Sequence, residues 1–150
     1  MRPVVVVGVD GTCSGREALR LATARAGALG ARLLAVHVPP PTPVLWSLSM
    51  SLAAEAVQWR AELEEAAFFD TAEVADRAGV DWDFAVDGGD VAGVLAREAR
   101  RRHAALLVVA AGARHRHAHR CPARRLAAAG DVPVLVAAPA GAGSPESAPR

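Results

Sequence analysis

The chain has 150 residues, of which 52% are hydrophobic, so it fits one domain with a buried core. Its formal net charge is +1, so no overall electrostatic field attracts it to nucleic acid or acidic membranes. Apart from histidine, every basic side chain is an arginine, which excludes mechanisms that need a lysine, such as a Schiff base or a P-loop. The sequence has only two cysteines and no apolar run near the ~18 to 20 residues of a membrane span, so we expect a cytoplasmic protein without a membrane partner.

Strands and helices alternate along the first part of the chain. Val4–Val9 is an unbroken, mostly β-branched run, typical of a strand buried on both faces. Ser14 and Glu17 have the spacing of a capping box, which predicts a helix that ends near Gly30. A second buried strand is expected over Arg32–Val38.

The middle of the chain is predicted to hold a long helix and an edge strand. Prolines make regular structure impossible between Pro39 and about Leu48. Apolar residues then recur at helical spacing from about Ser49 to Ala78, which predicts one helix with one apolar stripe. Asp81–Val86 alternates with a period of two, so this strand should lie at an edge with one wetter face.

The last part of the chain repeats the alternation. Asp90 is expected to cap a helix that runs to about Arg101, and Ala104–Ala111 is another buried strand. A short helix over Pro122–Ala129 then precedes a last strand over Val132–Ala137.

This order predicts an α/β fold, an open five-stranded parallel sheet with helices on both faces, of the Rossmann-like type. We expect residues 1–139 to form one domain and residues 140–150 to be a disordered tail, because the tail has no apolar periodicity.

A ligand site is expected between the ends of the first and fourth strands. In an open parallel sheet, ligands bind beyond the carboxyl ends of the strands, where the strand order reverses. If these strands are neighbours, Asp10 faces the loop that Gly112 opens. The carboxylate could then accept from a ribose hydroxyl or an adenine amine, and the loop could cradle phosphate. Alternatively, Asp10 only caps the turn into the first helix; the residue types favour neither interpretation.

Five segments, in this order, resemble the universal stress protein family. They are Val5–Leu29 (VVVGVDGTCSGREALRLATARAGAL), Leu33–Val38 (LLAVHV), Gly89–Leu95 (GDVAGVL), Leu106–Arg114 (LLVVAAGAR) and Val132–Val136 (VPVLV). The resemblance covers essentially the whole chain apart from the tail. It implies the fold derived above, a homodimer formed through the last strand, and membership of a family with ATP-binding and non-binding members.

The resemblance also implies candidate nucleotide-binding residues, with base and ribose held around the aspartate and the valine after the histidine of the second strand. The positions that match those of binding members are Val9, Asp10, Val38, Ala111 and Gly112.

The sequence departs from the family at its phosphate motif, which reads Gly, two residues, Gly, nine residues, Gly and then Ser or Thr. Gly112 supplies the first glycine, but the second position is His115. Counting back from Pro133 places Arg120 and Cys121 where the final Gly–Ser would fall, about five residues too early. Side chains in place of these glycines would crowd a phosphate, so we expect ATP binding to be weak or absent.

Arginines in the same loop keep an alternative open. Arg114, Arg116 and Arg120 could pair with phosphate through their side chains. The alternative function is therefore an adenine-nucleotide sensor that uses Asp10 and the Gly112 loop, with ATP as a possible cofactor.

A cluster of histidines in this loop is a second alternative site. In extended backbone, His115, His117, His119 and Cys121 would point to one side, and such ligands suit zinc. A solvated, arginine-rich loop is favoured over a metal site, because true sites usually draw ligands from more than one element.

No pair of a nucleophile and a base accompanies the candidate site, and the dinucleotide fingerprint G-x-G-x-x-G is missing after the first strand. We therefore expect a regulatory or interaction module of a stress response and no enzyme. Its apolar last strand, Val132–Val136, favours pairing with a second copy, because an uncovered edge invites aggregation.

Overall fold

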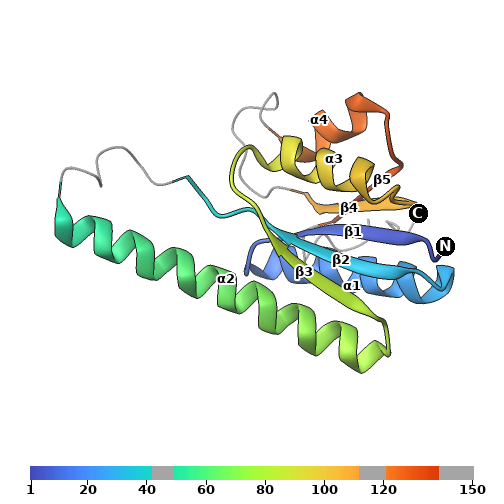
Figure 1. Ribbon diagram of the computed structural model, residues 1–150, viewed down its shortest axis with the longest axis horizontal. Helices are drawn as coiled ribbons and strands as arrows, with labels where there is room; N and C mark the ends of the chain where they lie inside the picture. The colour runs from blue at the N-terminus through green and yellow to red at the C-terminus, as the bar shows by residue number, and fades with distance from the viewer. Residues whose placement is uncertain (42–48, 112–120, 139–150) are drawn as a thin grey trace, which may run out of the picture.

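The computed structural model of the chain describes residues 1–41, 49–111 and 121–138, which form an α/β domain of three layers (Figure 1). Its elements are β1 (Val4–Val9), α1 (Cys13–Leu29), β2 (Arg32–His37), α2 (Met50–Ala78), β3 (Trp82–Val86), α3 (Val91–Arg101), β4 (Leu106–Ala110), α4 (Pro122–Ala129) and β5 (Val134–Ala137). The predicted order is confirmed, with small shifts at the element ends. The predicted tail lies outside the described residues.

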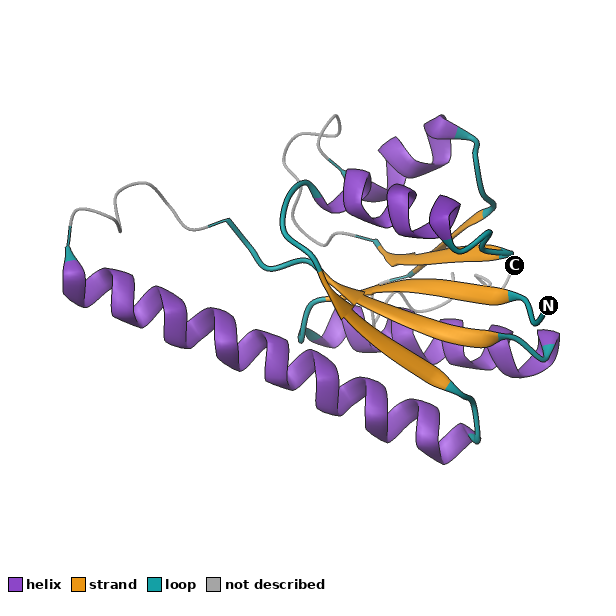
Figure 2. Cartoon of the chain, viewed as in Figure 1, coloured by secondary structure: helices purple, strands orange, loops and turns teal. Residues whose placement is uncertain are grey.

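The five strands form one parallel sheet in the order β3-β2-β1-β4-β5 (Figure 2). The predicted fold class is confirmed, and β3 lies at an edge as its alternating pattern indicated. Because the chain first builds outward from β1 to β3 and then returns to place β4 beside β1, the strand order reverses between β1 and β4. β1 and β4 are therefore neighbours, as the predicted site between their ends requires.

Helices cover both faces of the sheet, α1 and α2 on one and α3 and α4 on the other (Figure 1). β1 alternates between the two cores: Val5 and Val7 pack toward α1, and Val6 packs toward α3. All three side chains are fully buried, which explains the unbroken apolar run of this strand.

The first helix does not start at the predicted capping box. The N-cap is Thr12, whose side chain accepts a hydrogen bond from the Gly15 amide, and Ser14 already lies inside the helix. Glu17 does not reach back to the N-cap but forms an ion pair with Arg20. The reason is that Asp10 holds Thr12 through two hydrogen bonds, which places the threonine oxygen over the first turn.

Helix α2 is joined to the sheet by its C-terminal half. There, Phe68 makes edge-on ring contacts with Trp82 and Phe84 of β3. The predicted stripe is only partly buried, because Ala67 is covered whereas Leu52 and Trp59 of the N-terminal half are exposed. No helix in the described part of the chain is long and apolar enough to cross a membrane.

Candidate functional site

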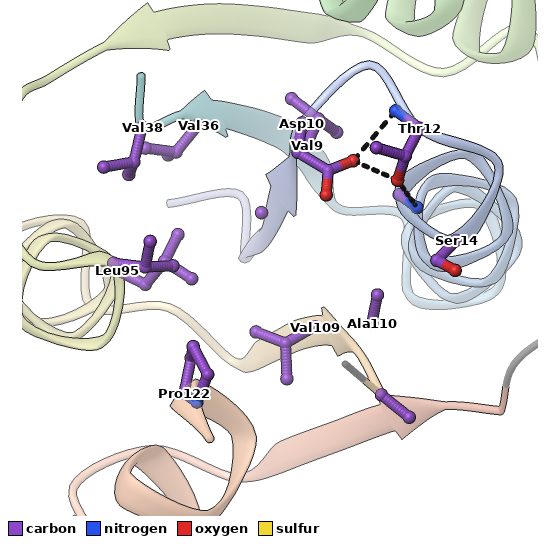
Figure 3. Close-up of a pocket in the computed structure, with 14 residues that line it drawn as sticks. Val9, Asp10, Thr12, Ser14, Val36, Val38, Leu95, Val109, Ala110 and Pro122 are labelled. Atoms are coloured by element: carbon purple, nitrogen blue, oxygen red, sulfur yellow. Dashed lines mark hydrogen bonds between the residues drawn. The ribbon is translucent and has the colours of Figure 1, made fainter. Parts of the chain in front are cut away.

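A cavity of about 530 Å³ lies at the carboxyl ends of β1 and β4, where the strand order reverses (Figure 3). This is the position at which open parallel sheets bind ligands, and the volume is in the range of small-molecule sites. Its described lining consists of Gly8, Val9, Asp10, Thr12, Ser14, Gly15, Val36, Val38, Val91, Leu95, Val109, Ala110, Ala111 and Pro122.

Asp10 follows β1 directly and has two roles. One carboxylate oxygen accepts hydrogen bonds from the Thr12 amide at 2.9 Å and the Thr12 hydroxyl at 2.6 Å. The other oxygen points away from Thr12 toward the space between Leu95 and Val109 (Figure 3). The two interpretations of this residue are thus compatible: the carboxylate orders the turn into α1 and also presents an acceptor to the cavity.

The tight turn between β1 and α1 depends on two glycines. Gly11 has a φ of +77°, which other residues rarely adopt, and it lies against the backbone of Leu63 in α2. A Cβ atom at Gly15 would lie 2.2 Å from the bonded oxygen of Asp10. The first turn of α1 can therefore approach the carboxylate only because residue 15 has no side chain.

His37 holds the end of β1 from the other side. It is fully buried, and its Nδ1 donates to the carbonyl oxygen of Val9 at 2.9 Å, since a carbonyl can only accept. It is therefore a hydrogen-bonded core histidine. Its Nε2 has no hydrogen-bond partner in the described part of the chain. The histidine links β2 to the residue that precedes Asp10, so it helps to position the Asp10 backbone.

The wall opposite Asp10 is apolar. Leu95 of α3, Val109 of β4 and Pro122 of α4 line it, together with Val36 of β2 and Val38, which follows that strand (Figure 3). Leu95 and Pro122 were not among the predicted site residues. Val36 was not predicted either, but it could have been found from its spacing, because it lies two residues before Val38 and so shares one face with it.

Two arginines near the N-termini of α1 and α4 are held by carboxylates. Arg16 pairs with Asp70 at 2.5 Å and with Glu73 at 2.9 Å, and Arg125 pairs with Asp90 at 2.7 Å. The hydrogen bond from Arg125, and after it the one from the Gly93 amide, lowers the pKa of Asp90 below its usual value.

Four of the predicted site residues, Val9, Asp10, Val38 and Ala111, line this one cavity. Gly112 and Arg114 lie outside the described residues, and their contribution stays a prediction. The same holds for the histidines of the possible zinc cluster. Cys121 is described, as the N-cap of α4, and the described ranges contain no group of three or more potential metal ligands.

Comparison with known proteins gives one consistent result. A family model described as the universal stress protein family matches residues 1–138. Among solved structures, a universal stress protein in complex with cAMP is 24% identical, with a TM-score of 0.70 over 89% of this chain and 95% of that one. A family member from Burkholderia pseudomallei is 28% identical, with a TM-score of 0.64 over 89% and 93% of the two chains. A universal stress protein from Lactobacillus plantarum is 20% identical, with a TM-score of 0.62 over 91% and 99%. No curated protein is significantly similar in sequence.

Proposed function

Because this chain belongs to the universal stress protein family, we propose that it is a regulatory module of a stress response that acts through binding rather than catalysis. The observation that carries this proposal is the match of the family model to residues 1–138. The described lining of the cavity offers no pair of a general acid and a general base, since Asp10 is its only ionisable side chain and one of its oxygens is bonded to Thr12. We place the protein in the cytoplasm, without nucleic acid as a partner.

We further propose that the module is a homodimer formed through the last strand, Val132–Val136. In the sheet, β5 is an edge strand, and Val136 on it is 43% exposed. An apolar edge strand leaves backbone amides and carbonyls available for pairing. Pairing with the same strand of a second copy would give hydrogen-bond partners to the backbone groups of both β5 strands in one two-fold interface.

The test compares the two edges of the sheet. In Val136→Asp, the two-fold axis of the dimer would bring the new carboxylates of the two copies close together, where they would repel each other. We therefore expect this variant to be monomeric at micromolar concentration by analytical ultracentrifugation. Val86→Asp is a matched control, because Val86 lies on the opposite edge strand, β3, and is also 43% exposed. It should remain dimeric. A wild-type monomer, or equal dimerisation of both variants, would contradict a β5 interface.

We expect ATP binding by this module to be weak or absent, because His115 and Arg120 stand where the family has glycines. The second candidate function, adenine-nucleotide sensing, is supported by the position of the cavity and by the cAMP that the 24% identical structure holds. Isothermal titration distinguishes the two candidate functions, because low-micromolar ATP binding by the wild-type protein would favour the sensor.

A further inference from the structure

The aromatic side chains of this protein gather at the edge of the sheet that β3 forms. The chain has three phenylalanines, three tryptophans and no tyrosine. All three phenylalanines and one tryptophan form a connected cluster, in which the Phe68 ring makes edge-on contacts with Phe69, Trp82 and Phe84 at centroid distances between 5.3 and 5.7 Å. None of the buried hydrophobic residues in the described ranges is aromatic. The protein thus builds its core from small aliphatic side chains and places these four rings at an edge.

The aromatic cluster is partly open to solvent. Phe69 is 59% exposed and Phe68 is 41% exposed, both in the C-terminal half of α2, and the two rings on β3 are half-buried. Val86 lies two residues after Phe84, so its side chain extends the same side of β3, and it is 43% exposed. Aromatic rings supply much of the binding energy of protein interfaces. Rings kept out of the core and left at the surface therefore indicate a contact surface.

β3 also presents an open hydrogen-bonding edge, because among the described strands it pairs with β2 alone (Figure 1). The Leu33 amide donates to the Asp81 carbonyl at 2.9 Å, and the Asp87 amide donates to the His37 carbonyl at 3.1 Å. In a parallel pair the backbone groups of successive residues alternate in direction. The backbone groups that point away from β2 are therefore those of Trp82, Phe84 and Val86. A strand added about 4.8 Å away would bond to these groups and lay alternate side chains along the aromatic cluster.

Exposed carboxylates of α2 border this surface. Glu62 and Glu65 lie seven and four residues before Phe69, and Asp76 lies seven residues after it, so helical spacing puts them on one face. Asp76 accepts a hydrogen bond from the indole nitrogen of Trp82 at 2.8 Å, which places this face beside β3. None of the three carboxylates forms an ion pair within the described ranges. Their charge therefore favours a partner with basic side chains.

We propose that the β3 edge binds an extended segment of a partner protein, with apolar side chains at alternate positions and arginine or lysine beside them. A second copy of this chain does not fit, because pairing β3 with itself would bring the carboxylates of two α2 helices together. β5 carries no carboxylate and keeps its role as the dimer edge. The proposal goes beyond the homodimer, since it assigns the opposite edge of the sheet to a different partner.

The experiment is affinity selection of a random dodecapeptide display library on the immobilised full chain. We expect the enriched peptides to alternate apolar and polar positions and to carry a net positive charge. Fluorescence polarisation of the synthesised peptides then compares variants. Phe69→Ser should weaken binding about tenfold, because it removes an exposed ring from the contact. Glu65→Lys should also weaken binding and reduce its dependence on salt.

Two matched variants serve as controls and should bind the selected peptides as tightly as the wild type. Leu29→Ser also removes an exposed apolar side chain, which is 52% exposed and belongs to α1. Glu55→Lys makes the same charge change on α2 as Glu65→Lys, but ten residues earlier and so about 15 Å away, beyond the range of screened charges.

Hydrogen exchange by NMR distinguishes an added strand from a merely apolar contact. The amides that face the open edge, those of Trp82, Phe84 and Val86, should exchange faster in the free protein than those of Asp83 and Ala85. A bound peptide should slow exchange of the first group about tenfold or more and leave the second group unchanged.

Three results would overturn the proposal: no enrichment on the wild type relative to Phe69→Ser, enrichment of acidic peptides, or bound peptides that leave the outward amides of β3 unprotected. Each of these would leave the homodimer in place, because ultracentrifugation of the β5 variants tests it separately.

Discussion

At the scale of single residues, the candidate site depends on the contact between Asp10 and the first turn of α1. The carboxylate, Thr12 and the Gly15 amide form one chain of hydrogen bonds that sets both the helix start and the acceptor in the cavity. Gly15 is the residue on which this arrangement depends most, because any side chain there would collide with the Asp10 carboxylate.

We therefore predict that Gly15→Ala destabilises the protein by about 1–3 kcal/mol, as expected for overpacking, and weakens ligand binding through displacement of Asp10. Gly27→Ala is the matched control in the same helix, because the nearest atom to its new Cβ would be 3.8 Å away. It should be stabilising by about 0.5–1 kcal/mol through helix propensity. Urea unfolding measures both changes in stability, and equal midpoints for the two variants would contradict a collision between residue 15 and Asp10.

The sequence identified Asp10 as a site residue and left its role open, but it misplaced the cap. Ser14 and Glu17 satisfied the capping-box spacing, whereas the cap is Thr12. Local spacing could not decide this, because Thr12 is selected by its hydrogen bonds to Asp10, which depend on the turn at Gly11. Pro122 could not be assigned to the cavity for a similar reason: its place depends on how α4 packs beside β4.

At the scale of elements, α1 and α2 are joined on one face of the sheet by Arg16, which bridges Asp70 and Glu73. The hydrogen bond from Arg16 is the largest cause that lowers the pKa of Glu73, and the positive charge of Arg16 adds to it. A carboxyl whose pKa is lower in the folded state stabilises the fold above its unfolded pKa, and this contribution is lost as the pH falls through the folded value.

We predict that Arg16→Gln lowers stability near neutral pH and that its difference from wild type shrinks as the pH falls below 4.5, the usual pKa of Glu73. Chemical unfolding at a series of pH values from neutral to acidic measures this. Arg25→Gln is the control in the same helix, since Arg25 forms none of the ion pairs found among the described residues. A difference that stays constant with pH would show that Arg16 acts only through packing.

The order and type of the elements were predictable because each carries its own pattern. The apolar runs of β1 and β4 reflect burial on both faces, and the alternation in β3 reflects its edge position. The partial exposure of the α2 stripe was not predictable, since helical spacing is the same whether or not a sheet lies beneath it. Leu52 and Trp59 belong to the half of α2 that is less covered.

At the scale of the whole molecule, one sheet presents a cavity at the carboxyl ends of its strands and an apolar edge at β5. β4 connects them, since it lines the cavity with Val109 and pairs with β5 at the same residue. A ligand in the cavity would thus lie one strand away from the proposed dimer interface, which is a suitable arrangement for a module that regulates through binding.

Native mass spectrometry of the purified full chain with added ATP examines dimerisation and ATP binding in one measurement. For a homodimeric module with weak or absent ATP binding, we expect a species of twice the 15.5 kDa chain mass without retained ATP. A monomer, or a dimer that carries one ATP in each chain, would contradict it.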